Sequence, residues 1–380
     1  MVTKSTVQQK EKRNGVRCET FPLKKIIMAV IFVSVLVHGA FAQTVYTSGM
    51  YFDYNNGGWK ACYWQGTTRI DLPIPEKMRE SRASSIAVSR GTVYTAGAYG
   101  YDYYKSNACY WEGVKRTDLP VPGDASSHAT SIAVANGIIY TAGSYELSDL
   151  KSTACYWQGI QRTDLPVPGG TKNSRANSIA VANGIIYTAG GYAPESFVSY
   201  SESTPCYWQG TTRIDLPIPE GASSSQANSI TITNGTIYIA GSYGIYIGES
   251  YYDKPCYWKG TTRTDLPIPE DQTIADAISI TVYNGIVYVL GHYSTVGYAR
   301  DDWYWPCYWE GTTRKDIDTK LIESANSIAI SKGTVYIAGS NSTGVAYHRK
   351  PCYLQGTTRI DLPIPSTATT SFVTSIAVAE

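Results

Sequence analysis

A single twelve-residue motif recurs seven times along this chain and constrains its fold more than any other feature. CYWQGTTRIDLP begins at Cys62 and again at Cys206. Looser copies begin at Cys109, Cys155, Cys256, Cys307 and Cys352. Six intervals separate Cys62 from Cys352, so the repeat period is about 48 residues. A fixed period of roughly 20 to 50 residues indicates a repeat architecture such as a solenoid or a propeller.

Each repeat contains four short segments with the composition of β-strands. SIAV and IIYTAG, as found between Ser131 and Gly143, are rich in β-branched and aromatic residues and are separated by Asn-Gly, which is typical of a tight hairpin. CYW and TRID follow, joined by a turn that contains Gly, and the next Pro ends the fourth strand. Residues 43–380 show no helical periodicity. The repeat therefore predicts an all-β fold with four antiparallel strands per unit.

Seven such units predict a seven-bladed β-propeller. After the N-terminal region the chain opens on a second strand, VYTSG, with no SIAV segment before it, and it ends on SIAVAE with no second strand after it. We therefore expect the C-terminal strand to complete the blade that the N-terminal segment begins. That pairing closes the ring and removes exposed sheet edges, whereas an open solenoid would need polar caps.

Residues 1–42 have the features of a leader. They hold seven Lys and Arg against two Glu, followed by the apolar run IIMAVIFVSVLV and by Ala40 and Ala42 in a small-x-small arrangement. We expect cleavage after Ala42, export of residues 43–380 as one propeller domain, and no membrane span after cleavage. The alternative is an uncleaved anchor, although the apolar run is shorter than the ~20 residues that a bilayer span needs.

Charge and cysteine placement exclude several function classes. The formal net charge is +1, which argues against nucleic acid as a partner. Cys18 falls in the leader, and the other seven cysteines fall one per repeat. This spacing suits neither a disulfide framework nor a C-x-x-C metal site, so we expect seven buried free thiols, no metal and no cofactor.

The TRID segment carries Arg and Asp two residues apart, on one face of the strand, as in Arg69 and Asp71. The pair occurs in all seven repeats, ending with Arg359 and Asp361. A site made seven times is unusual for catalysis. We therefore expect these pairs to bridge blades or to reach a turn amide.

The order of these motifs resembles the tandem HAF repeats of extracellular bacterial proteins. An apolar-aromatic-Trp strand, Thr-Asp-Leu, a Ser/Gly-rich loop and Ala-x-Ser-Ile recur over nearly all of residues 43–380. The chain departs from that pattern in having Cys-Tyr-Trp for Ala-Phe-x-Trp, and it lacks Leu-Gly-Gly after Asp-Leu. The resemblance implies an exported propeller and brings no catalytic residue with it.

The repeats diverge most between the second and third strands, in segments rich in Tyr, Ser, Gly and Asp, a composition suited to adaptable contacts. The alternative is that their aromatic side chains fold back over the blades. As ligand-binding candidates we take Trp59, Tyr103, Tyr104, Tyr251, Tyr252, Arg300, Asp301, Asp302, Trp303, Tyr304 and Trp305.

Catalytic signatures are absent from the sequence. Residues 43–380 hold three histidines in three different repeats, His128, His292 and His348, and no nucleophile motif or phosphate loop. No catalytic residue is assigned. The non-repeated carboxylate pairs that could act on a glycosidic bond are Asp301 with Asp302, Glu195 with Glu202, and Glu249 with Asp253.

These observations predict an exported, monomeric binding or interaction module with a Tyr/Trp-rich rim. The expected partner is a carbohydrate or a protein at the cell surface, because aromatic rings stack on sugar faces while Asp, Asn and Ser bond to hydroxyls. A glycan-processing enzyme using the same rim, and a passive envelope protein, are the alternatives.

Overall fold

The computed structural model describes residues 43–102, 105–147, 151–194, 203–248, 250–294, 304–345 and 348–379. The predicted leader, with Cys18, lies outside these residues. Within them, no helix is long and apolar enough to cross a membrane. Residues 42–380 form one compact unit by themselves, and the fold described below is that of this unit.

Strands make up the regular structure of the described residues, in four layers counted from the centre outward. The innermost strands are β28 (Ala368–Ala379), β4 (Glu80–Ser89), β8 (Ser126–Ala135), β12 (Thr171–Ala182), β16 (Ala222–Thr233), β20 (Ile274–Tyr283) and β24 (Ser324–Ser331). The second are β1 (Thr44–Asp53), β5 (Thr92–Gly100), β9 (Ile138–Glu146), β13 (Ile185–Pro194), β17 (Thr236–Ile247), β21 (Ile286–Ser294) and β25 (Thr334–Ser342). The third are β2 (Gly58–Gln65), β6 (Ser106–Glu112), β10 (Ser152–Gln158), β14 (Thr204–Gln209), β18 (Ser250–Lys259), β22 (Trp305–Glu310) and β26 (Arg349–Gln355). The outermost are β3 (Thr68–Asp71), β7 (Lys115–Asp118), β11 (Gln161–Asp164), β15 (Thr212–Asp215), β19 (Thr262–Asp265), β23 (Thr313–Asp316) and β27 (Thr358–Asp361).

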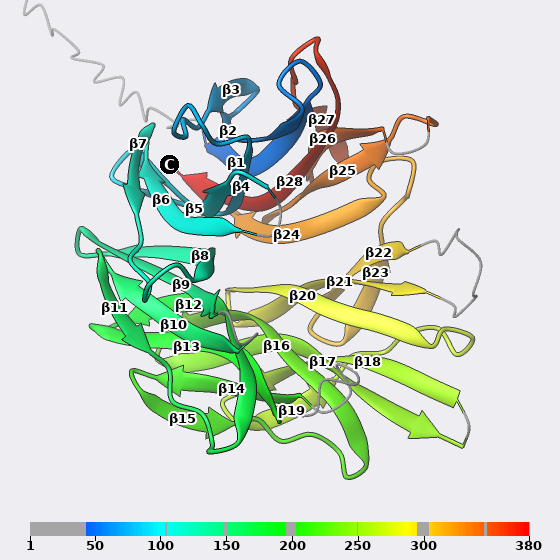
Figure 1. Cartoon of the computed structure of the whole chain (residues 1–380). Coiled ribbons are helices and arrows are strands. Elements are labelled where there is room, and N and C mark those ends of the chain that lie inside the picture. The colour runs from blue at the N-terminus through cyan, green and yellow to red at the C-terminus, as the bar shows by residue number, and fades with distance from the viewer. Residues whose placement is uncertain are drawn as a thin grey trace, which may run out of the picture. The chain divides into compact units, whose positions relative to one another are not determined.

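Seven four-stranded antiparallel units result, which confirms the predicted propeller. Five are separate sheets, and the units β8–β11 and β12–β15 are joined into one larger sheet by a single parallel pair, Ser152 with Asn173. Each innermost strand contacts the innermost strand of the next unit, and β28 contacts both β24 and β4, so the ring is closed (Figure 1). The blades are numbered below from blade 1 (β28, β1–β3) to blade 7 (β24–β27).

The two ends of the propeller meet in blade 1, as predicted. β28 pairs antiparallel with β1 from Thr44 opposite Ala379 to Asp53 opposite Ala368, and Figure 1 shows the red β28 beside the blue β1. The hairpin turns also follow the prediction. Asn136 and Gly137 have φ of 52° and 77°, and Arg90 and Gly91, which take the same place in blade 2, have 50° and 76°.

The repeated Cys and Trp are core residues. All seven described cysteines are free and buried, in agreement with the prediction. In blade 4, Cys206 and Trp208 are fully buried and pack against Tyr156 and Leu165 of blade 3. The indole Nε1 of Trp208 donates to the carbonyl of Pro166 in blade 3 at 2.9 Å, so the buried ring keeps its hydrogen bond. The Trp residues of blades 1, 2, 3, 5 and 6 each donate in the same way to a Pro carbonyl of the preceding blade, at 2.8–3.0 Å.

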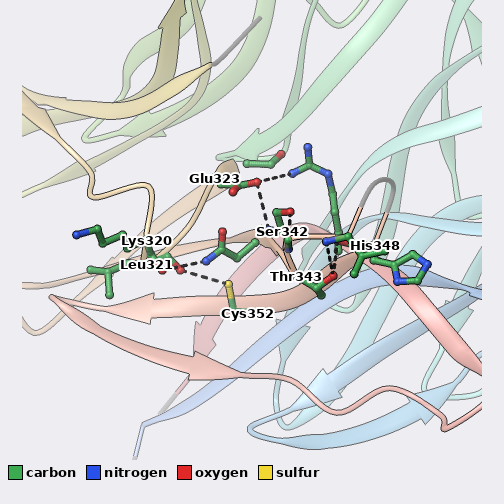
Figure 2. Close-up of polar contacts among 12 residues, drawn as sticks. Lys320, Leu321, Glu323, Ser342, Thr343, His348 and Cys352 are labelled. Atoms are coloured by element: carbon green, nitrogen blue, oxygen red, sulfur yellow. Dashed lines mark hydrogen bonds and ion pairs between the residues drawn. The ribbon is translucent and has the colours of Figure 1, made fainter. Parts of the chain in front are cut away.

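Blade 7 has no Trp–Pro hydrogen bond at this place and uses other contacts instead. Leu354 stands where the other blades have Trp, and the connection from blade 6 reads IDTKLIE where the other connections begin with LPIP or LPVP. Here Asn341 donates through Nδ2 to the carbonyl of Lys320 at 2.9 Å, and the Glu323 carboxylate accepts the backbone N–H of Ser342 at 3.2 Å (Figure 2). The Asn341–Lys320 bond therefore joins blade 7 to the connection from blade 6, where a Trp–Pro bond joins the other pairs, and the Glu323–Ser342 bond lies within blade 7.

The Arg–Asp pairs correct one expectation. In each blade the Arg Nε donates to the Asp carboxylate of the same strand at 2.6–2.9 Å. In blades 1 to 6 the guanidinium also lies over a Tyr of the second strand in the same blade, as Arg116 does over Tyr99 at 4.6 Å, whereas blade 7 has Asn341 at that position. The expected bridge between blades is wrong for most copies. Among the described residues it occurs only as 3.5 Å contacts from Arg162 and Arg359 to carbonyls of the preceding connection, because the pair satisfies its charges locally.

Candidate functional site

The strands that reach the variable rim are longer than the repeat motif suggests. β4 begins at Glu80, five residues before the SIAV segment, and the connection from β17 to β18 comprises only residues 248–249. We call this end of the propeller the rim face: the starts of the innermost and third strands, the ends of the second strands, and the connections between the second and third strands. Side chains on the rim face are therefore largely held by strand backbone.

One position of the innermost strands differs in every blade except two. Each of these strands has a β-bulge directly before the repeated Ser, as between Ala83 and Ser85. The position two residues before the bulged residue, called the axial ring, is occupied in blades 1 to 7 by Phe372, Arg82, His128, Arg175, Gln226, Asp276 and Ser324. These residues combine apolar, basic, amide and acidic side chains at equivalent places around the ring.

Basic side chains occupy three successive blades of the axial ring: Arg82, His128 and Arg175. Ser106 of blade 2 places its Oγ 2.9 Å from Nδ1 of His128 in blade 3. Burial, together with the positive charges of Arg82 and Arg175, lowers the pKa of His128 to about 4, so the imidazole is neutral near pH 7. We call these three residues the basic arc.

Acidic and hydrogen-bonding side chains lie across blades 5 and 6. Asp276 is directly opposite His292 in the β20–β21 pair, and its Oδ2 lies 3.8 Å from His292 Nε2. Ser242 of blade 5 donates through Oγ to Asp276 Oδ1 at 2.6 Å. Burial lowers the pKa of His292, while the charge of Asp276 opposes that shift. The ring of Tyr304 meets His292 edge-on, with centroids 4.8 Å apart.

A second carboxylate belongs to the same group. Burial raises the pKa of Asp253 to about 6; the charge of Asp276 adds to the rise and the hydrogen bond from Tyr251 opposes it. The Tyr251 hydroxyl donates to Asp253 Oδ1 at 3.0 Å. It lies over Gly244, where a Cβ would be only 2.0 Å from the Tyr251 hydroxyl oxygen. We call Ser242, Tyr251, Asp253, Asp276 and His292 the acidic cluster.

A recess of about 120 Å³ opens between blades 1 and 2. Its lining includes Met50, Trp59, Glu80, Arg82, Asp102 and Ser106. Because ligand pockets usually enclose ~300–1,000 Å³, this recess has room for one part of a larger ligand. Its wall includes Arg82 of the basic arc and Ser106, the partner of His128.

The predicted binding residues separate into three groups. Tyr103, Tyr104, Arg300, Asp301, Asp302 and Trp303 lie outside the described residues. Trp59, Tyr251, Tyr252 and Trp305 are in strands, not in the loops where the sequence placed them. Tyr304 lies in the connection before β22 and keeps 48% of its surface exposed.

Several of these aromatic side chains do fold back onto the blades. Trp305 stacks on Tyr293 with centroids 5.8 Å apart, and Trp59 packs against Phe52 and Phe372. Lys254 lies over the Tyr252 ring. Tyr304 is exposed beside the acidic cluster, and so is Tyr246, which is 61% exposed and meets Tyr251 edge-on at 5.1 Å. Exposed aromatic surface on this side therefore lies next to carboxylates.

The chemistry of the acidic cluster is that of hydrogen bonding and proton transfer. Ser242 and His292 both face Asp276, so His292 is not placed as a base for the Ser242 hydroxyl. Asp253, which holds its proton up to about pH 6, could act as an acid. No group of three or more potential metal ligands occurs in the described part of the chain.

The axial ring was missed by sequence reasoning, although the sequence contains its signal. Aligning the repeats on Ala-x-Ser-Ile, with Val373 in place of Ala in the last, shows Arg, His, Arg, Gln, Asp, Ser and Phe directly before it. This variable position lies inside a regular strand, whereas the predicted binding residues came from the variable segments between the second and third strands.

Comparisons with known proteins identify the fold alone. No family model matches the chain, and no curated protein matches it, so the resemblance to HAF repeats stays an expectation. Similar solved structures include the polysaccharide lyase Uly1 (10% identity, 84% of this chain and 91% of that one, TM-score 0.46) and the β-propeller domain of the Trilobed protease from Pyrococcus furiosus (11%, 85% and 93%, 0.48). A prolyl endopeptidase structure is 9% identical, with 85% of this chain covering 50% of that one at a TM-score of 0.50. The chain is thus a β-propeller, and at these identities no activity is carried over.

Proposed function

We propose that this propeller is an exported carbohydrate-binding module whose ligand lies on the rim face. The observation that carries the proposal is the exposed ring of Tyr304 beside the His292–Asp276 pair. An aromatic ring offers apolar surface to a sugar face, and a neighbouring carboxylate accepts hydrogen bonds from its hydroxyls. Tyr246 repeats the arrangement beside Tyr251 and Asp253.

The rigidity of these groups supports binding. Asp276, His292, Tyr251 and Asp253 all lie within strands, and the backbone N–H of Asp253 donates to the carbonyl of Thr273 in the next blade at 2.8 Å. Side chains held in this way lose little conformational freedom when a ligand binds.

A glycan array with residues 43–380 tests the proposal. Tyr304→Ala and Tyr246→Ala remove the exposed rings, and each is expected to weaken binding at least ten-fold. Ile160→Ser is the matched control, because Ile160 is 60% exposed in the turn between β10 and β11, at the opposite rim. An array without a bound glycan, or binding unchanged in both tyrosine variants, would contradict the proposal.

Glycan processing on the same face is a second candidate, favoured by the raised pKa of Asp253 next to Asp276. A protonated Asp253 would serve as general acid and an ionised Asp276 as base or stabiliser. The test is release of reducing ends from the array-positive glycan. Turnover lost in Asp253→Asn with binding retained would support it, and the absence of product would rule it out.

A further inference from the structure

The basic arc is confined to one side of the axial ring. Arg82, His128 and Arg175 come from β4, β8 and β12 of successive blades at one register position. The equivalent places in the other four blades hold no basic residue. A seven-fold repeat would spread its charge evenly, so this asymmetry belongs to the individual copies and not to the fold.

The three side chains come from adjoining strands, because β8 contacts both β4 and β12. Burial disfavours a positive charge on His128, and the charges of Arg82 and Arg175 add to that effect. Ser106, Arg82 and the recess adjoin, because Ser106 and Arg82 line the recess and Ser106 contacts His128. The arc thus offers guanidinium and imidazole groups at the edge of a space that can admit one substituent of a ligand.

Two carboxylates near Arg82 disfavour the binding of an anion in the recess. Glu80 and Asp102 also line the recess. The Glu80 carboxylate accepts the backbone N–H of Trp59 at 3.2 Å, and Asp102 accepts that of Lys105 at 3.0 Å. These N–H donors partly compensate the charges of the two carboxylates. Arg175 is exposed and lies in β12, two blades away from the recess side of blade 2. The positive side of the arc therefore extends from His128 toward Arg175.

We infer that the carbohydrate bound on the rim face is acidic, and that its carboxylate or sulfate group is held by Arg82, His128 and Arg175. This inference rests on the proposed function. A guanidinium binds such oxyanions through two parallel hydrogen bonds, and His128 lies between the two arginines around the ring. The acidic cluster on blades 5 and 6 repels the anionic group and accepts sugar hydroxyls, so the ligand binds in one orientation.

Calorimetric titration with one acidic oligosaccharide and its modified forms tests the inference. The probes are a sulfated, uronate-containing hexasaccharide, its desulfated form, its carboxyl-reduced form, and the neutral backbone with both groups removed. The acidic probe is expected to bind at least ten-fold more tightly than the neutral backbone at 50 mM NaCl, with most of the difference lost at 500 mM. The two singly modified probes show whether sulfate or carboxylate is recognised.

Arg82→Gln and Arg175→Gln are each expected to bring the acidic probe to the affinity of the neutral one. Arg90→Asn is the matched control, because Arg90 lies in a hairpin turn at the opposite rim where four other blades carry Asn with a similar positive φ. As a second readout, the pKa of His128 followed by NMR should rise when the acidic probe binds. Equal binding of acidic and neutral probes, with the arginine variants unchanged, would overturn the inference and leave the proposed function standing. If no probe binds while the array shows a neutral glycan held on the rim face, the inference alone is overturned, whereas a blank array contradicts the proposed function.

Discussion

The hydroxyl of Ser375 in β28 accepts a hydrogen bond from the backbone N–H of Ile86 in β4 at 3.4 Å. Six equivalent Ser–Ile bonds of 3.2–3.3 Å join the other neighbouring blades, so a ring of seven bonds surrounds the centre. The repeated Ser of the SIAV segment thus links each blade to the next.

Removing one of these links should destabilise the propeller. Ser375→Ala leaves the N–H of Ile86 without this acceptor, so we expect the free energy of unfolding to fall by about 1–2 kcal/mol. Thr68→Ala, at an exposed position of β3, is the control and should change it by less than about 0.5 kcal/mol. Urea denaturation measures both. Equal stability of the two variants would show that the ring of bonds contributes nothing.

Loss of the C-terminal strand should destabilise every blade. Deleting residues 375–380 removes the pairing of Thr44–Ser48 with β28 and the contacts of Ile376 with blade 7. We expect one cooperative thermal transition at a temperature lower by at least about 10 °C. A variant that melts with the full chain would show that closure through β28 is unnecessary.

The seven thiols should be unreactive in the folded protein. Burial raises the pKa of Cys109 well above its usual range and so suppresses the thiolate, and the other six described cysteines are buried in the same way. Ellman's reagent should titrate seven thiols in denatured residues 43–380 and almost none in the native protein. Fast native reaction, or fewer than seven thiols after denaturation, would contradict this placement.

Asp253 should make stability depend on pH. Its pKa is about 6 in the folded protein against 3.8 for the unperturbed group, so the folded state binds the proton more tightly. Stability from this group therefore increases as pH falls through 6 and is complete below about 4. Asp253→Asn mimics the protonated form, keeps an acceptor for Tyr251, and should be more stable than the parent by about 1 kcal/mol at pH 7.5, after allowance for solvent screening.

Denaturation midpoints of the parent and Asp253→Asn between pH 4 and pH 8 measure this difference. It should shrink toward zero near pH 4. Asp271→Asn, which changes an exposed carboxylate, should follow the parent throughout. A constant difference between parent and Asp253→Asn would mean that burial of the charge is not its cause.

The fold could be predicted from the repeat because each local signal has one physical meaning. Asn136–Gly137 specifies a hairpin, Pro73 follows the end of β3, and the SIAVAE end specifies closure with β1. The site could be predicted only in part. Tyr251 and Asp253 belong to a long hairpin whose strands continue through a segment that composition marks as a loop, because backbone pairing prevailed over its Gly and Ser content.

The sequence does not predict which side chains of neighbouring blades lie together, for a different reason. Asp276 and Ser242 are 34 residues apart and belong to neighbouring blades, so their contact depends on how one blade packs on the next. Likewise, Arg82, His128 and Arg175 are each separated by about one repeat. Only the ring, with its bulge two residues later, brings them to one register position.

Hydrogen–deuterium exchange with and without the strongest glycan from the array tests most directly whether the rim face is the binding surface. The account predicts slower exchange at the starts of β4, β8, β12 and β20 and in the β17–β18 hairpin, with no change at the hairpin turns such as Asn136–Gly137 on the opposite rim. Slower exchange at those turns, with the rim face unaffected, would contradict it.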